Sequence, residues 1–129
     1  MKYILLIIVA TLLASCSSAG AEVNTLTKVN TLTSQEAYEL VTGDTEIIIL
    51  DVRSEEEFRS GHIAYSISLP VDEISERAEA MLPDKDAMIL VICRSGVRSQ
   101  VASQELVDLG FTNVYDIGGI MSWPGELID

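Results

Sequence analysis

Histidine and basic residues are scarce in this chain of 129 residues. His62 is the only histidine, so the imidazole pairs that many metal sites use cannot form, and we expect no metal site. Lysine and arginine number 8 against 20 aspartate and glutamate residues, which gives a formal net charge of −12. A chain this acidic lacks the basic surface that attracts nucleic acid or anionic lipid headgroups. We therefore expect neither as a partner.

The chain also lacks an apolar run long enough to cross a membrane comfortably. Its first apolar run extends only from Ile4 to Ala14, whereas a spanning helix needs ~20 residues to cross ~30 Å. Lys2 precedes this run, and the small residues Ser15, Ser17 and Ser18 follow it around Cys16. A charged start, a short apolar run and small residues are typical of a signal peptide, which we predict over residues 1–15.

Cysteine is rare as well, with only Cys16 and Cys93 present. The segment Leu13-Ala14-Ser15-Cys16 resembles the lipobox of bacterial lipoproteins, in which the cysteine becomes the lipidated first residue. The resemblance implies a lipid anchor on Cys16 that holds the protein to a membrane on the extracytoplasmic, periplasmic side of the cell envelope. A generic secretory signal is the alternative. Cleavage after Ser15 would leave 7 basic and 20 acidic residues, a net charge of −13, and Cys93 as the free thiol.

A short internal repeat follows the predicted signal. Val23-Asn24-Thr25-Leu26-Thr27 recurs as Val29-Asn30-Thr31-Leu32-Thr33, and two copies are too few for a repeat architecture. We interpret residues 16–33 as a polar tether, whose second copy is expected to supply a short first strand. Residues 34–129 then form one domain, which suits the length of the chain.

Two apolar, β-branched runs, 46–51 and 87–92, predict strands that are buried on both faces. Helical patterns lie between and around them, and alternation of this kind predicts an α/β domain with a small, mostly parallel sheet and helices on both faces. The expected helices are 35–41 with Ser34 as N-cap, a short one opened by the capping box 54–57, 72–82, and 99–109 with Val101 facing inward. The remaining expectations are short strands at 66–70 and 114–116 and a turn at Gly118-Gly119.

Two of the predicted strands end on polar residues, at Asp51 and at Cys93. Ligands bind at the carboxyl ends of strands in parallel sheets, so both positions are candidates for a site. The segment after Cys93 reads Arg94-Ser95-Gly96-Val97-Arg98-Ser99 and leads into a helix. Backbone N–H groups of such a loop, the helix N-terminus and two arginines all favour a reactive thiolate and an anionic substrate. An inert buried cysteine is the alternative, and the flanking cations and Gly96 argue against it.

Three blocks of the chain together resemble the single-domain rhodaneses, which are thiosulfate sulfurtransferases with a three-layer rhodanese-like fold. The first is Asp51-Val52-Arg53-Ser54-Glu55-Glu56-Glu57-Phe58 with Gly61-His62-Ile63, the second is Cys93 to Ser99, and the third is Asp116-Ile117-Gly118-Gly119 with Trp123. Together they cover about residues 34–129. The sequence departs from the family at Ala64-Tyr65-Ser66, where Pro-Gly-Ala is common.

The resemblance implies a sulfurtransferase that works through a persulfide on Cys93, with no metal and no organic cofactor. A small anionic donor such as thiosulfate would supply the sulfur, and cyanide or a thiol would accept it. Backbone amides from Arg94 to Ser99 (through Ser95, Gly96 and Val97) would stabilise the anionic sulfur, with Arg94 and Arg98 on the oxyanion. Asp51, Arg53, His62 and Trp123 are interpreted as structural residues near the site, and a monomer is expected.

Two other functions stay open. Phosphatases and arsenate reductases of this fold use a loop one residue longer, Cys-x5-Arg, whereas Arg98 gives Cys-x4-Arg here. The smaller ring favours sulfur over tetrahedral phosphate. The second alternative is a non-catalytic sulfur carrier or protein-binding module of the same fold.

Overall fold

The computed structural model describes residues 27–44 and 46–129. The predicted signal peptide (residues 1–15) and Cys16 lie outside these residues and stay predictions. Within the described ranges no helix combines the length and the apolar character that a membrane crossing requires.

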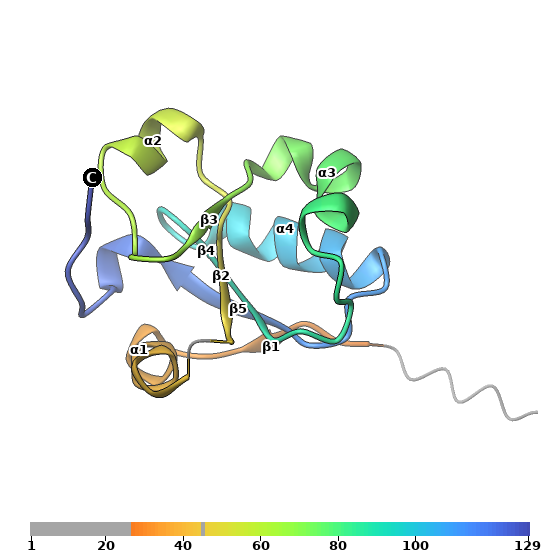
Figure 1. Ribbon diagram of the computed structural model, residues 1–129, viewed down its shortest axis with the longest axis horizontal. Helices are drawn as coiled ribbons and strands as arrows, with labels where there is room; N and C mark the ends of the chain where they lie inside the picture. Colours follow the sequence, from red (N-terminus) through yellow and green to blue (C-terminus); the bar gives the residue numbers. More distant parts are fainter. Residues whose placement is uncertain (1–26, 45) are drawn as a thin grey trace, which may run out of the picture.

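The core of the domain is a five-stranded sheet in the order β1-β5-β4-β2-β3 (Figure 1). The strands are β1 (Asn30–Thr31), β2 (Ile48–Asp51), β3 (Ile67–Ser68), β4 (Ile89–Cys93) and β5 (Val114–Gly119). Every pairing between them is parallel. The short strand expected from the second repeat copy is present as β1, at the edge of the sheet beside β5.

Helices cover both faces of this sheet. They are α1 (Ser34–Gly43), α2 (Glu55–Arg59), α3 (Ile74–Met81) and α4 (Val97–Asp108), with 3₁₀ turns at η1 (Val71–Glu73) and η2 (Ile120–Ser122). In Figure 1, α3 and α4 lie together on one side of the sheet, whereas α1 lies on the other. The arrangement confirms the predicted three-layer α/β fold.

Alternation along the strands divides the apolar side chains between the two faces. Leu50, Val91 and Cys93 belong to the core under α3 and α4, where the buried helix residues include Ile74, Ala78, Ala102 and Leu106. Ile49, Leu90 and Ile92 belong to a second, smaller core, whose only buried residue from α1 is Ala37. The α3/α4 face is therefore closely packed, and the α1 face is covered by a single helix.

Several element boundaries differ from the sequence expectation. The N-cap of α1 is Thr33, one residue before Ser34, because Thr33 Oγ1 accepts from Glu36 N while Thr33 N donates to the Glu36 carboxylate. Both central strands begin two residues later than expected, at Ile48 and Ile89.

Helix α4 differs most from the expectation. It begins at Val97 instead of Ser99, because the left-handed Gly96 (φ +100°) serves as its N-cap. Val101 was expected to face inward and is instead 50% exposed, because Ala102 and Leu106 occupy the buried side of the helix. The prediction for Val101 was therefore wrong.

Candidate active site

Cys93 and Asp51 end two neighbouring strands at the same edge of the sheet. Strands β2 and β4 are parallel and pair directly, with Asp51 opposite Ile92. Figure 1 shows α2 and the start of α4 beyond this edge. The sequence-predicted site residues that follow Asp51 and Cys93 therefore meet at the carboxyl ends of the strands, where α/β proteins bind ligands.

The Cys93 side chain is fully buried beneath the loop that follows it. Gly96 N donates a hydrogen bond to Cys93 Sγ, with the two atoms 2.9 Å apart. Helix α4 starts at the next residue and has no side-chain cap, so the partial positive charge of its N-terminus lies beside the sulfur. Both features stabilise negative charge on Sγ, which is what a nucleophilic thiol needs. Arg94 and Ser95 are exposed at the outer side of the loop.

A buried carboxylate supports the loop from the inside. Ser99 Oγ donates to Asp116 Oδ1 at 2.7 Å, and Gly118 N donates to the same oxygen at 3.0 Å. Ser99 is fully buried and Asp116 is 7% exposed, so the hydrogen bond between them is shielded from water. Asp116 was noted in the sequence only as part of the closing block. The positioning of Ser99 by Asp116 depends on a contact between residues far apart in the chain, which no local pattern indicates.

The expected turn at Gly118-Gly119 is instead the end of β5, and this prediction was wrong. The register with β4 shifts here, so that Val91 pairs with Asp116 but Cys93 pairs with Gly119. A Cβ atom on Gly119 would overlap the Arg94 carbonyl oxygen. Gly119 therefore lets β5 run directly beneath the loop, and no other residue fits without displacing it.

Arg98 is bound by a carboxylate from α2. Its Nη1 and Nη2 atoms donate to Glu57 Oε1 and Oε2 at 2.6 and 3.0 Å. The hydrogen bonds from Arg98, with smaller contributions from Ser54, lower the pKa of Glu57 to about 2, and the same pairing raises the pKa of Arg98. In the sequence Glu57 was interpreted only as part of the capping box 54–57 and of the first motif block. The capping box of α2 is confirmed, but Glu57 also holds the first turn of α4.

Asp51 and Arg53 pair with each other behind the loop. Arg53 Nε and Nη2 donate to the Asp51 carboxylate at 2.9 and 2.7 Å, and Nη2 also donates to the Gly61 carbonyl oxygen at 2.7 Å. Both side chains are almost fully buried. This pair ties the end of β2 to the segment that follows α2.

His62 and Trp123 lie outside the loop itself. His62 Nδ1 is 2.8 Å from the Phe58 carbonyl oxygen, its ring stacks on Phe58, and its backbone pairs with Ile128. Trp123 packs edge-on against Tyr38 of α1, with ring centroids 5.5 Å apart. In residues 27–44 and 46–129 no cluster of three or more His, Cys, Asp or Glu side chains could hold a metal ion.

Comparison with known proteins agrees with this fold. Residues 33–126 match the family model of the rhodanese-like domain. The chain belongs to the rhodanese-like family, whose relatives include sulfurtransferases.

Individual relatives cover most of the domain. The putative sulfurtransferase YtwF of Bacillus subtilis is 38% identical over 68% of this chain and 84% of its own length. The thiosulfate sulfurtransferase GlpE of Coxiella burnetii is 39% identical over 70% of this chain and 83% of its own. Among solved structures, a rhodanese-related protein from Thermoplasma volcanium is 31% identical and superposes with a TM-score of 0.67, over 77% of this chain and 97% of that one.

Proposed function

We propose that this protein is a thiosulfate sulfurtransferase that carries sulfur as a persulfide on Cys93. The observation that carries the proposal is the hydrogen bond of 2.9 Å from Gly96 N to the Cys93 sulfur at the N-terminus of α4. An N–H group aimed at sulfur, together with the helix dipole, favours the thiolate and later the anionic persulfide. The relatives named as sulfurtransferases support the same chemistry.

In the first step the Cys93 thiolate attacks the outer sulfur of thiosulfate. A new S–S bond forms as the bond between the two sulfur atoms of the donor breaks, and sulfite leaves with the bonding electron pair. Cys93 is fully buried, which favours a donor whose reacting atom is small and terminal. The outer sulfur of thiosulfate has this character.

In the second step an acceptor removes the outer sulfur from the persulfide. Cyanide attacks that sulfur, the S–S bond breaks, and thiocyanate leaves while the Cys93 thiolate is restored. A thiolate acceptor takes the sulfur in the same way and becomes a persulfide itself. Each step conserves charge and electrons, so the cycle needs no oxidant or metal, as expected for two-step covalent transfer.

The two loop arginines have different roles in this proposal. Glu57 neutralises Arg98, so the pair holds the loop in shape instead of binding the donor. Arg94 is exposed and forms no ion pair with the described residues, which leaves its charge available for the sulfonate end of thiosulfate. This assignment refines the sequence-based hypothesis, in which both arginines held the donor.

The direct test is formation of thiocyanate from thiosulfate and cyanide, with the wild type beside Cys93→Ser. We expect turnover in the wild type and none above background in the variant, and equal rates would exclude Cys93 as the nucleophile. Arg94→Gln should raise KM for thiosulfate with little change in kcat, because a pure binding contact is lost. Equal effects of Arg94→Gln and Arg98→Gln on KM would refute the division of roles.

The same samples separate the alternatives. A mass gain of one sulfur atom on Cys93 without turnover would indicate a sulfur carrier. Release of phosphate from an aryl phosphate, lost in Cys93→Ser, would indicate a phosphatase.

We also propose that a lipid on Cys16 anchors the domain to the extracytoplasmic face of a membrane, supported by the lipobox-like Leu13-Ala14-Ser15-Cys16. Cys16→Ala should move the protein from the membrane to the soluble fraction while its specific activity is kept. Unchanged fractionation of the variant would refute the anchor.

A further inference from the structure

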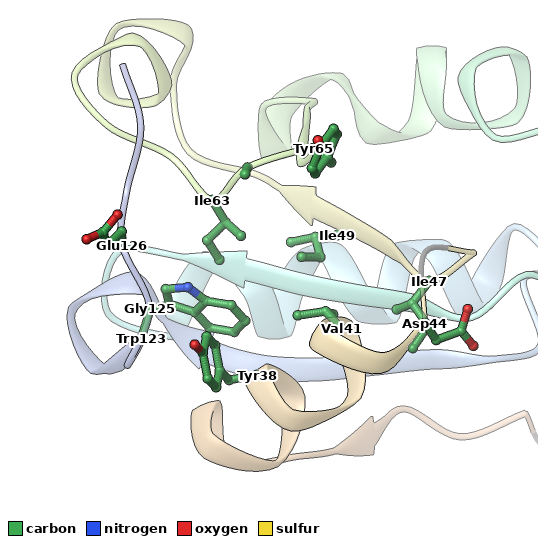
Figure 2. A pocket seen from close by; sticks show the side chains of 11 residues that line it. Tyr38, Val41, Asp44, Ile47, Ile49, Ile63, Tyr65, Trp123, Gly125 and Glu126 are labelled. Atoms are coloured by element: carbon green, nitrogen blue, oxygen red, sulfur yellow. The ribbon is translucent and has the colours of Figure 1, made fainter.

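A cavity of about 550 Å³ lies on the α1 face of the sheet, away from Cys93. Ile49 of β2 and Ile63 lie on its inner side, Val41 comes from α1, and Trp123 follows η2 (Figure 2). The cavity exists because one helix covers this face of the sheet. Its volume falls within the range of ~300–1,000 Å³ typical of small-molecule pockets. No residue from Cys93 to Ser99 lines it, so the sulfur-transfer step does not use it.

Aromatic side chains wall this cavity. Tyr38 and Trp123 form an edge-to-face pair at one end, and Figure 2 shows both rings beside Gly125. Gly125 fits closely there, since a Cβ atom on it would come within 2.9 Å of Trp123 Nε1 and within 2.8 Å of the Tyr38 ring. The tail after η2 therefore packs against the aromatic pair and helps to form the wall. Aromatic faces of this kind attract organic cations.

Tyr65 lines the same cavity and adopts a strained backbone conformation. It is the one non-glycine residue with positive φ (+63°) in the described ranges, and its side chain is 99% exposed. The left-handed conformation is unfavourable for a non-glycine residue, because its Cβ atom comes too close to the following carbonyl oxygen. The exposed Tyr65 ring has no packing that offsets this strain. Strain of this kind at a cavity points to a function of the side chain rather than of the fold.

Among the described residues that line the cavity, all the charge is negative. Its charged residues are Asp44 and Glu126, and Figure 2 shows them at opposite ends of the cavity. Asp44 Oδ1 accepts a hydrogen bond from Glu46 N, and neither carboxylate forms an ion pair with the described residues. An apolar, aromatic cavity with carboxylates at its ends complements a ligand that has an apolar body and a positive charge.

We propose that this cavity binds a small organic cation, an amine or quaternary ammonium compound with an aromatic or alkyl body. The body lies on Ile49 and Ile63 beside the rings of Tyr38 and Trp123, and Tyr65 lies at the exposed rim of the cavity. The positive group lies at Glu126 or Asp44. This site is separate from Cys93 and does not depend on the proposed sulfur transfer.

Trp123 is the only tryptophan in the chain, so its fluorescence reports on the cavity directly. The full chain is titrated with 2-phenylethylammonium, and with neutral 2-phenylethanol and anionic 3-phenylpropionate as matched probes. We expect saturable binding of the cation, at least ~10-fold tighter than the alcohol, with the anion weakest. Equal affinity of the cation and the alcohol, or no saturable signal from the cation, would overturn the proposal.

Variants locate the binding. Glu126→Gln and Val41→Phe should each weaken binding of the cation several-fold, the first by removing charge and the second by filling space. Glu76→Gln makes the same charge change on α3 of the other face and should leave binding unchanged. An equal loss of affinity in Glu76→Gln would show that the effect comes from the net charge of the chain. That result would overturn the proposed site.

Tyr65→Gly separates a binding role from a structural one. The variant removes the strained backbone and the ring together, so its melting temperature should not fall, whereas its affinity for 2-phenylethylammonium should fall several-fold. Unchanged affinity would exclude Tyr65 from the site. A lowered melting temperature would show that the Tyr65 ring stabilises the fold. The strained backbone would then no longer support a binding role for Tyr65.

Discussion

The two faces of the sheet are built differently although they share the same strands. On one face α3 and α4 pack against Leu50 and Val91 and enclose Cys93 completely. On the other face the cover over Ile49 and Ile92 consists of one α-helix, α1, together with η2 and the segment around Ile63, and a cavity remains. Because side chains alternate along β2 and β4, neighbouring residues of one strand contribute to a close-packed core and to an open one. The closely packed face carries Cys93 and the loop that follows it. The face under α1 has room for a small ligand.

The largest expected difference between the faces is in the stability of truncated variants. Leu106 is the fully buried leucine of α4, and Leu106→Ala should destabilise the domain by ~2–5 kcal/mol, because a closely packed core cannot collapse into the space. Val41 is half-buried at the cavity, and Val41→Ala should cost less than ~1 kcal/mol. Urea unfolding measures both. Similar losses would mean that the α1 face is packed as tightly as the other.

The next effect concerns the loop on the packed face. Asp116→Ala removes the acceptor of a buried hydrogen bond from Ser99 Oγ and of a partly buried one from Gly118 N. It should cost ~1–3 kcal/mol in unfolding free energy. Loss of the Ser99 position should also lower kcat for thiocyanate formation. Asp116→Asn keeps an acceptor oxygen and should retain most of the unfolding free energy and most of kcat. A fully active Asp116→Ala would show that the loop holds its shape without this support.

A smaller, pH-dependent effect belongs to Glu57. Because Arg98 lowers the pKa of Glu57 to about 2 in the folded state, the stabilisation is complete above the ordinary carboxyl pKa of ~4.3 and is lost as the pH falls toward 2. The pair is partly exposed, so we expect Glu57→Gln to cost only ~1 kcal/mol at pH 7. The difference from wild type should shrink between ~pH 4 and ~pH 2. Glu56→Gln, on the exposed side of α2, should show no such trend.

The smallest expected effect is an increase in stability, and it concerns Tyr65 on the α1 face. Tyr65→Gly relieves a left-handed backbone at the cost of a more flexible unfolded chain, so a net stabilisation of ~0.5–1 kcal/mol is expected from thermal unfolding. Ala64→Gly, at the preceding residue, is a suitable control and should not stabilise. A destabilised Tyr65→Gly would show that the aromatic ring contributes packing to the open face.

The sequence predicted the fold and the position of Cys93, the candidate nucleophile, well. Apolar runs before Asp51 and Cys93 indicated buried parallel strands, and both residues lie at the carboxyl edge of the sheet. The sequence did not indicate the contacts of Asp116 and Glu57, because each joins segments that are distant in the chain. Val101 was assigned to the wrong side of α4, because helical periodicity alone does not say which of two adjacent apolar residues faces the core.

The sequence by itself determined the order of the elements and the choice of Cys93 as the candidate nucleophile, since hydrophobic periodicity and the residues after Cys93 are local properties. Only the tertiary structure showed that Arg98 pairs with Glu57 whereas Arg94 is exposed, because Glu57 comes from α2, which is distant in the chain. It also decided that Tyr65 lines a cavity with Tyr38 and Trp123. Pairings across the sheet depend on three-dimensional packing, which no short stretch of sequence encodes.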